Sequence, residues 1–412
     1  MQSTATATGV AALASAFAPA VHSAGSDIVK VGLVGCGGRG RGAILNALKA
    51  DYRAQVTALA DAFPDALQDA KKSLKEPAGK QYAVDDDHCF VGIDAYKQLI
   101  PEVDVVLLCS PPHFRPAHLE AAITAGKHIF CEKPIATDPT GVRKVLELAA
   151  LAKEKKLNLV SGLCWRYDVG VKETIQRIKD GAIGDIVNIQ ENYLTGTLWN
   201  KTRKPGWSDM EFQLRNWLYY RWLSGDHIVE QFIHSLDKSL WLHDDEPPKF
   251  AYGLGGRQVR TDEQFGDVYD HFSVVYEWKD GTRTFAHTRQ MAGCLTETED
   301  YVYGTKGSAK VLAHEISGPN AWKRPKGDKP SMYDEEHREL FAAIRDGRTI
   351  NNGQYMCYST LMAIMGREAC YSGSKIEWDK LLNSPLDMTP PSYAMGSAPE
   401  VQVPMPGTYK LA

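Results

Sequence analysis

The distribution of hydrophobic positions changes character once along the chain. Between Ile28 and about Gly162, short continuous apolar runs alternate with segments of helical periodicity. Apolar runs without polar alternation are typical of parallel strands that are covered on both faces. The alternation of strand and helix therefore predicts a doubly wound parallel α/β sheet. Its predicted strands are 28–35, 55–61, 103–110, 128–134 and 157–162.

The clearest predicted helix in this half spans residues 138–156. Asp138 can cap its amino end, and Pro139 fits the first helical position. The lysines near its end suit the helix dipole. Another helix is predicted over residues 40–50, directly after the first strand and its glycines.

Beyond Gly162 the predicted strands are longer and alternate apolar with polar residues, as in sheets with one solvated face. Lys279-Asp280-Gly281 predicts a hairpin turn between two of them. We therefore expect a second α/β domain with an open, largely antiparallel sheet. Its strands are expected within 186–196, 271–293 and 299–312, and its helices at 227–242, 333–347 and 353–373.

A chain of 412 residues is too long for one ordinary core. We divide it into a first domain at 27–162, a second at 163–382, and a Pro-rich arm at 383–412 that is expected to lie over a neighbouring subunit. Residues 1–26 contain no Lys, Arg, Asp or Glu. They match either an export signal without its charged start, which implies a periplasmic or exported protein, or a disordered tail on a cytoplasmic one.

Composition narrows the class of protein. The net charge is -4 and no basic stripe stands out, so nucleic acid is not an expected partner. No apolar run reaches the roughly 18 to 20 residues that a membrane-spanning helix needs. The cysteines are scattered and are interpreted as buried free thiols, with disulfides as the alternative. No metal is expected, because the histidines form no ligand spacing.

A glycine-rich turn follows the first predicted strand. The sequence from Gly35 to Gly40 matches G-x-G-x-x-G, with a strand before it and a helix after it. Asp61 ends the next strand about 20 residues later, where an acidic side chain accepts hydrogen bonds from an adenosine ribose. The turn predicts a dinucleotide site that prefers NAD. NADP stays an alternative because Arg39 is close. The predicted cofactor contacts are Gly35, Gly37, Gly38, Arg39, Gly40 and Asp61.

Two further groups of residues have the chemistry of a reaction site. Lys133 lies in Cys-Glu-Lys-Pro at the end of a predicted strand, where doubly wound sheets bind ligands. Glu230, His234 and Asp237 share one face of the predicted helix 227–242. By itself, each group also fits an ordinary structural role, as a solvated lysine or as a packed core helix.

Taken together, these motifs resemble the Gfo/Idh/MocA family, named for glucose–fructose oxidoreductase, inositol dehydrogenase and rhizopine catabolism. The resemblance covers nearly the whole chain after residue 27, and it rests on VGLVGCGGRG, CSPPH, CEKP, WRY and EQFIHSLD. It implies a Rossmann domain joined to an α/β domain whose open sheet often mediates oligomerisation, here a homodimer or homotetramer. It also implies oxidation or reduction of sugars and cyclitols with NAD(P).

The resemblance also implies roles for single residues. Lys133 would hold and polarise the reacting hydroxyl, and His234 would be the general acid/base. Glu230 stands where many relatives have Asp, and Glu230 or Asp237 would orient the imidazole. Further cofactor contacts would be Ser110, Pro111, His113, Glu132, Lys133 and Arg166, and further substrate contacts would be Trp165, Arg166, Glu230, His234 and Asp237.

Three functions fit these motifs. The first is a sugar or cyclitol dehydrogenase that exchanges free NAD(H). The second is a redox-neutral glycoside cleavage or sugar–sugar oxidoreduction with a tightly bound cofactor. The third is a non-catalytic NAD-binding regulator, against which the presence of Lys133 and His234 argues. The aromatic segment 207–227 suits either carbohydrate binding or a subunit interface.

Overall fold

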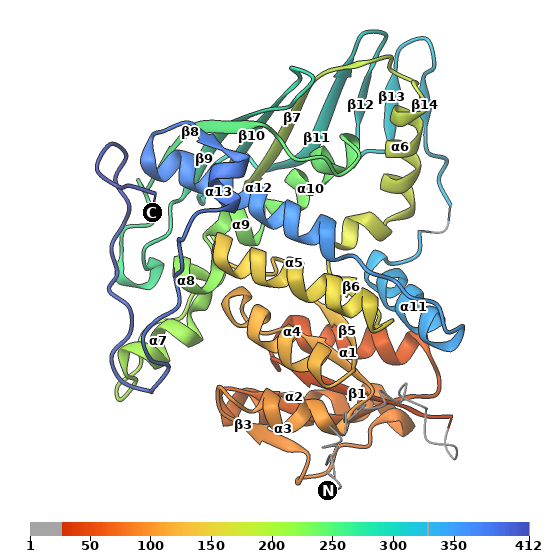
Figure 1. The fold of residues 1–412 in the computed structure, drawn as a ribbon, viewed down its shortest axis with the longest axis vertical. Helices are drawn as coiled ribbons and strands as arrows, with labels where there is room; N and C mark the ends of the chain where they lie inside the picture. The colour runs from red at the N-terminus through yellow and green to blue at the C-terminus, as the bar shows by residue number, and fades with distance from the viewer. Residues whose placement is uncertain (1–26, 328, 412) are drawn as a thin grey trace, which may run out of the picture.

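The computed structural model describes residues 27–327 and 329–411, which form two sheets and the helices around them (Figure 1). The interpretation of residues 1–26 as a signal or tail lies outside the described residues. The first sheet is six-stranded and parallel, in the order β3-β2-β1-β4-β5-β6. Its strands are β1 (Val29–Val34), β2 (Ala54–Asp61), β3 (Cys89–Val91), β4 (Val105–Leu108), β5 (His128–Cys131) and β6 (Leu159–Ser161).

The predicted doubly wound sheet is confirmed, because helices cover these apolar strands. Asp138 caps α5 as predicted, since its Oδ1 accepts a hydrogen bond from Gly141 N at 2.7 Å. Four helices connect the strands: α1 (Gly38–Ala50), α2 (Pro64–Ala78), α4 (Arg115–Thr124) and α5 (Pro139–Glu154). Short turns add α3 (Tyr96–Leu99), η1 (Gly79–Gln81), η2 (Ile100–Glu102) and η3 (Pro112–Phe114).

The second sheet has nine strands in the order β14-β13-β12-β11-β7-β10-β9-β8-β15. Only β7 and β10 pair in parallel, so the predicted largely antiparallel sheet is confirmed. Its strands are β7 (Ile186–Thr195), β8 (Phe250–Gly256), β9 (His271–Glu277), β10 (Arg283–Gln290), β11 (Glu297–Gly304), β12 (Ser308–Lys310), β13 (Glu315–Ser317), β14 (Trp322–Lys323) and β15 (Ile376–Glu377).

A long, almost wholly buried helix, α12 (Gly353–Ser372), lies between the second sheet and α5 (Figure 1). It packs on α5, β8, β9 and α10 (Ile233–Leu242), so one core joins the two halves of the chain. The remaining elements are η4 (Cys164–Tyr167), α6 (Val169–Lys179), α7 (Asp209–Arg215), η5 (Trp217–Tyr219), α8 (Arg221–Ser224), α9 (His227–Glu230), η6 (Glu263–Phe265) and α13 (Trp378–Leu382).

Helix α11 (Met332–Arg345) returns to the first sheet after the second has been completed. It packs against α1, and its apolar face shares a core with the first strands. Leu340 and Phe341 belong to the same buried cluster as Val31 and Leu33. The first sheet is therefore covered partly by residues from the far end of the sequence.

The segment predicted as one helix over 227–242 is two helices, and this prediction is corrected. The hydrogen-bond ladder breaks at Gln231 and Phe232, between α9 and α10. Phe232 N donates to His227 O at 3.0 Å, five residues earlier, which widens the turn. Glu230 therefore ends one helix, and His234 lies in the first turn of the next.

The C-terminal arm, residues 383–411, has no regular element and runs past α8 and α7 (Figure 1). It is tied to its own chain by hydrogen bonds along its length. Met388 N donates to Asp138 Oδ2 at 3.0 Å, and Tyr269 OH donates to Pro404 O at 2.7 Å. The arm therefore packs on its own chain, and its position over a neighbouring subunit stays a prediction.

Within 27–327 and 329–411, no helix has the length and apolar character to cross a membrane. The cysteines of this part are free, and five of the eight are buried. This confirms their interpretation as mainly structural thiols. Cys294 is exposed.

Candidate active site

The glycine-rich turn between β1 and α1 has two crowded ends and an open middle. Gly35 has a φ of +96°, and a Cβ there would lie 2.6 Å from the backbone of Cys109. A Cβ on Gly40 would lie 2.0 Å from the Gly35 carbonyl oxygen. At Gly37 and Gly38, by contrast, a Cβ would meet nothing within 4 Å. The middle of the turn is thus free to approach a ligand, and its ends require glycine.

Asp61 lies at the end of β2 and closes this turn. Its carboxylate accepts hydrogen bonds from Cys36 N at 2.7 Å and from Phe63 N at 2.9 Å. Burial raises the pKa of Asp61, which these two bonds partly offset. A carboxylate has about four acceptor positions, so the side chain keeps capacity for ribose hydroxyls.

Arg39, in the same turn, is held between two buried carboxylates. It forms ion pairs with Glu132 after β5 and, at 2.7 Å, with Glu336 of α11. Its guanidinium also stacks over the ring of Tyr333 at 4.8 Å. Because Glu132 and Glu336 already engage its guanidinium, we expect Arg39 to weaken the preference for NAD over NADP less than its position in the turn suggests.

Glu132, predicted to contact a ribose, is 5% exposed, and its carboxylate binds groups of the protein itself. Burial opposes its ionisation, but the positive charges of Arg39, Lys133 and Arg115 together outweigh this effect and lower the pKa of the carboxyl. Its Oε2 also accepts a hydrogen bond from Lys133 N at 3.1 Å. The residue therefore braces the segment that carries Lys133.

Lys133 and Glu230 meet across the two halves of the chain. The Lys133 Nζ lies 2.9 Å from Glu230 Oε1, and it also donates to the Glu230 carbonyl oxygen. Both side chains are nearly buried, with 13% and 14% exposed. An ammonium has three N–H donors, so one remains for a substrate oxygen.

His234 is held in the neutral state next to this pair. Burial is the main reason that its pKa lies well below the ordinary value of 6.5, and the positive charge of Lys133 lowers it further. Its Nδ1 has no hydrogen-bond partner among the described residues, although it is buried. A neutral imidazole fits a group that accepts a proton.

Neither predicted carboxylate is hydrogen-bonded to this imidazole among the described residues, because Glu230 binds Lys133 and Asp237 has other partners. The Asp237 Oδ1 accepts hydrogen bonds from Ser359 Oγ at 2.7 Å and from Arg166 at 2.8 Å. Arg166 also pairs with Asp245 and stacks on the ring of Tyr355 at 4.0 Å. Arg166 and Asp237 thus form a buried brace at α10, and neither is among the residues that line the cavity beside the glycine-rich turn.

Of the other residues predicted from the resemblance, some line the cavity and others lie away from it. Ser110 and Pro111 line the same cavity as the glycine-rich turn. His113 points away from it, since its Nε2 lies 2.8 Å from the Tyr393 hydroxyl of the C-terminal arm. Burial lowers the pKa of His113 to about 4. Trp165 lies 5.3 Å from Lys238 Nζ and is outside the residues that line the cavity.

The cavity has a volume of about 710 Å³, which lies in the range of small-molecule and cofactor sites. Gly35, Gly37, Gly38 and Asp61 line one wall, so the geometry of the turn fits a dinucleotide. The opposite wall comes from the second domain: Leu198, Trp199, Asn200, Lys201, Leu214, Arg215, Trp217, Leu218, Glu230 and Gln231. The aromatic segment 207–227 pointed to part of this wall, but no pattern indicated Trp199 or Gln231.

Arg215 fastens this wall to the first domain. Its guanidinium forms a bidentate ion pair with Asp65 of α2, with distances of 2.8 and 3.1 Å, and stacks on Phe63 at 3.9 Å. Phe63 lies two residues after Asp61 in the sequence and lines the same cavity. The contact therefore lies beside the adenosine end of a dinucleotide bound at the turn.

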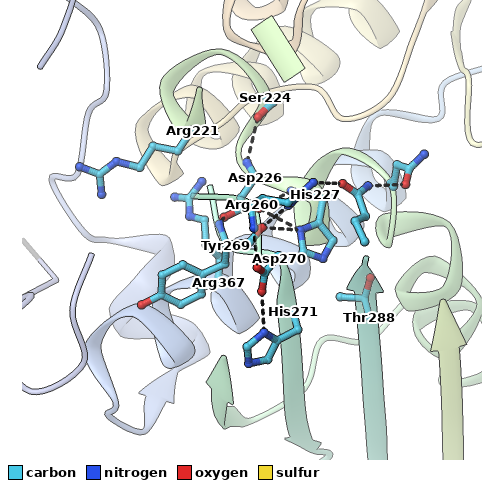
Figure 2. Close-up of polar contacts among 12 residues, drawn as sticks. Arg221, Ser224, Asp226, His227, Arg260, Tyr269, Asp270, His271, Thr288 and Arg367 are labelled. Atoms are coloured by element: carbon cyan, nitrogen blue, oxygen red, sulfur yellow. Dashed lines mark hydrogen bonds and ion pairs between the residues drawn. The ribbon is translucent and has the colours of Figure 1, made fainter. Parts of the chain in front are cut away.

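A buried polar network surrounds the start of α9 at Asp226 and His227 (Figure 2). Asp226 is fully buried and accepts hydrogen bonds from His227 N at 2.6 Å and Tyr269 N at 2.8 Å. Asp270 accepts from the backbone of the loop that carries Arg260. The Arg260 side chain is 1% exposed and points into this network. These hydrogen bonds therefore hold the start of α9 in place.

A parallel sheet with this turn at its carboxyl edge, and a cavity-lining Glu230 that binds a lysine and lies four residues before a neutral histidine, are the features of an NAD(P)-dependent oxidoreductase. Comparison with known proteins agrees. Residues 29–162 match a family model described as an oxidoreductase family with an NAD-binding Rossmann fold. Residues 171–310 match the GFO/IDH/MocA C-terminal domain. The chain belongs to the Gfo/Idh/MocA family, a family of NAD(P)-dependent dehydrogenases that act on CH–OH groups.

Two relatives illustrate the similarity. Inositol 2-dehydrogenase of Pseudomonas savastanoi is 33% identical over 338 residues, which cover 71% of this chain and 89% of that protein. Inositol 2-dehydrogenase of Rhizobium meliloti is 26% identical over 335 residues, which cover 78% of this chain and 90% of that protein.

Solved structures share the fold. A levoglucosan dehydrogenase in complex with NADH and levoglucosan superposes with a TM-score of 0.65 at 18% identity, covering 85% of this chain and 99% of that one. Aldose-aldose oxidoreductase from Caulobacter crescentus, complexed with glycerol, has a TM-score of 0.65 at 20% identity and the same coverage.

Proposed function

We propose that this enzyme transfers hydride between a nicotinamide cofactor and a secondary hydroxyl of a sugar, sugar derivative or cyclitol. The observation that carries the proposal is the Lys133–Glu230 pair, in which Glu230 lines the dinucleotide cavity and the neutral His234 follows four residues later. The named substrates of similar proteins, inositol and levoglucosan, are polyhydroxylated rings and support this substrate class.

Each residue has a distinct part in oxidation of the alcohol. A bound nicotinamide ring supplies the hydride acceptor. His234 takes the hydroxyl proton, for which a neutral imidazole is needed. The Lys133 ammonium donates to the same oxygen and stabilises the negative charge that develops on it. Glu230 holds Lys133 in place with both its carboxylate and its carbonyl oxygen. In reduction, the same groups act in reverse.

NAD is the proposed cofactor. A 2′-phosphate would lie near the Asp61 carboxylate, and like charges repel at short distance. Arg39, the nearest candidate for binding that phosphate, is engaged by Glu132 and Glu336.

The test is a substrate panel with NAD⁺ and NADP⁺, read out by the absorbance of the reduced cofactor. It comprises myo-inositol, scyllo-inositol, D-glucose and levoglucosan. We expect turnover of at least one panel member with NAD⁺, and the Lys133→Ala variant should lack it. Failure to bind any nicotinamide dinucleotide would overturn the proposal.

The way the second domain closes over the cavity favours a second candidate function. In this function the cofactor stays bound and the reaction is redox-neutral. The second-domain wall and the Arg215–Asp65 ion pair close over the adenosine side. An aldose–aldose oxidoreductase among the structural neighbours is consistent with such chemistry. Mass spectrometry of nucleotide released on denaturing fresh protein distinguishes the two. Near-stoichiometric NAD(H) supports the second candidate, and an empty protein that binds added NAD supports the first.

A further inference from the structure

Gln231 lies at the break between α9 and α10, between Glu230 and the turn that carries His234. It lines the cavity and is only partly exposed. A glutamine side chain can present either a donor nitrogen or an acceptor oxygen to a ligand. In this protein, a chain of buried hydrogen bonds decides which one.

The chain starts at Arg260, which is among the largest fully buried side chains. One of its terminal nitrogens donates to Tyr269 O, and the other donates to the Gln290 side chain. A guanidinium has donors and no acceptor, so the Gln290 atom that faces it must be the carboxamide oxygen. The orientation of the Gln290 amide follows from chemistry and needs no assumption about which atom is nitrogen.

The Gln290 nitrogen therefore faces the other way, and it donates to Gln231 Oε1 at 2.7 Å. Gln290 is 1% exposed, so no water competes for this bond. Because the Gln231 oxygen is occupied, its Nε2 is the end left for the cavity. No acceptor for this nitrogen is found among residues 27–327 and 329–411.

We propose that Gln231 is a substrate-binding residue whose carboxamide N–H donates to an oxygen of the sugar or cyclitol next to the reacting hydroxyl. Arg260 and Gln290 are positioning residues that fix the polarity of this amide. The inference rests on the proposed function, since it assumes that a polyhydroxylated ring lies beside Lys133 and His234. It adds a specificity contact: the ring position that meets Gln231 must carry a hydrogen-bond acceptor.

A donor fixed in advance discriminates between substrates better than a free one. The amide loses little rotational freedom on binding, because Gln290 already holds it. A substrate that lacks the oxygen leaves a partly buried N–H without a partner, which is costly.

The experiment compares Gln231→Glu and Gln290→Glu with wild type at saturating NAD⁺. The probe is whichever of myo-inositol, scyllo-inositol, D-glucose and levoglucosan is turned over fastest. The first variant replaces the donor by a carboxylate of the same shape. The second keeps an acceptor for Arg260 but cannot donate to Gln231, so the Gln231 amide turns its nitrogen inward and presents oxygen to the substrate. Both should raise KM about tenfold, with a smaller effect on kcat.

The controls separate positioning from damage to the fold. Gln68→Glu, on the exposed face of α2, adds the same charge and should leave KM unchanged. In a Gln231→Ala background, Gln290→Glu should have no further effect on KM, because the amide that it orients is gone. The Kd for NADH should be unchanged in every variant.

Three outcomes would overturn the inference. An unchanged KM in Gln231→Glu would show that the amide meets no substrate oxygen. A raised Kd for NADH with an unchanged KM would assign the amide to the nicotinamide carboxamide. Wild-type protein that oxidises none of the four probes would overturn the inference together with the proposed function, whereas the first two results leave that function intact.

Discussion

Lys133 and Glu230 are 97 positions apart in the sequence, yet the Lys133 Nζ lies 2.9 Å from Glu230 Oε1. One residue follows the strand β5 of the first sheet, and the other ends α9 of the second domain. The ion pair is nearly buried, and its lysine is bound a second time by the Glu230 carbonyl. The proposed reaction site thus exists only where the two domains are packed together.

Removal of either proposed catalytic group should abolish most turnover and spare cofactor binding. For Lys133→Ala and His234→Ala we expect kcat to fall by about 10²- to 10⁴-fold, the range for general acid–base groups. The Kd for NADH, measured by fluorescence, should change little. Lys127→Ala is a matched control, because that lysine does not line the cavity and its Nζ donates to Pro101 O. Wild-type turnover in either variant would refute the assignment.

The pH dependence should reflect a histidine that is neutral in the folded enzyme. Burial and the charge of Lys133 place the pKa of His234 below 6.5, so the base form persists as the pH falls through 6.5. For alcohol oxidation, log kcat/KM should therefore stay flat from pH 8 to 6.5 and decline only below that. Lys133→Met removes a positive charge, so the His234 imidazole should titrate at higher pH in NMR spectra of this variant. A limb above pH 6.5 in wild type would contradict the prediction.

Asp61 should control the choice of cofactor. Asp61→Ala removes both the acceptor for the ribose hydroxyls and the charge that repels a 2′-phosphate, so NAD binding should weaken more than NADP binding. Since Asp61 also holds Cys36 N, some loss of affinity for both is expected. The ratio of the two Kd values, determined by titration, is the decisive quantity, and an unchanged ratio would count against this role.

Arg215 should slow the release of cofactor. In Arg215→Ala the ion pair with Asp65 and the stacking on Phe63 are lost, and NADH dissociation in stopped-flow experiments should be about fivefold faster, as for the loss of about 1 kcal/mol. Arg203→Ala is the control, because Arg203 pairs with Asp209 and Glu263 of the second domain and does not line the cavity. Equal rates in both variants would remove the support for cofactor retention by this contact.

Local patterns in the sequence were enough to predict the first sheet and the glycine-rich turn. The apolar strands, the glycines and Asp138 act through neighbours a few residues away, so their signals are contiguous. The antiparallel character of the second sheet followed in the same way from its alternating strands.

The parts that sequence reasoning missed depend on partners far along the chain. Arg39 is paired with Glu336, 297 positions away, and no local pattern shows that its charge is already neutralised. Asp237 had helical spacing from His234, but Arg166 and Ser359 bind its carboxylate first. No local pattern predicts the helix break at Gln231 either, because it is supported by Gln290 and by the network around Asp226, which involve residues far along the chain.

Helix α11 has a consequence for how the protein is made. Because Leu340 and Phe341 complete the core beneath β1, the first sheet cannot be finished while the ribosome is still translating the second. An excised fragment that ends near residue 162 would expose that apolar surface and would be expected to aggregate. A chimera that exchanges cofactor domains between relatives must therefore include α11. A nonsense mutation upstream of α11 should likewise prevent the protein from folding.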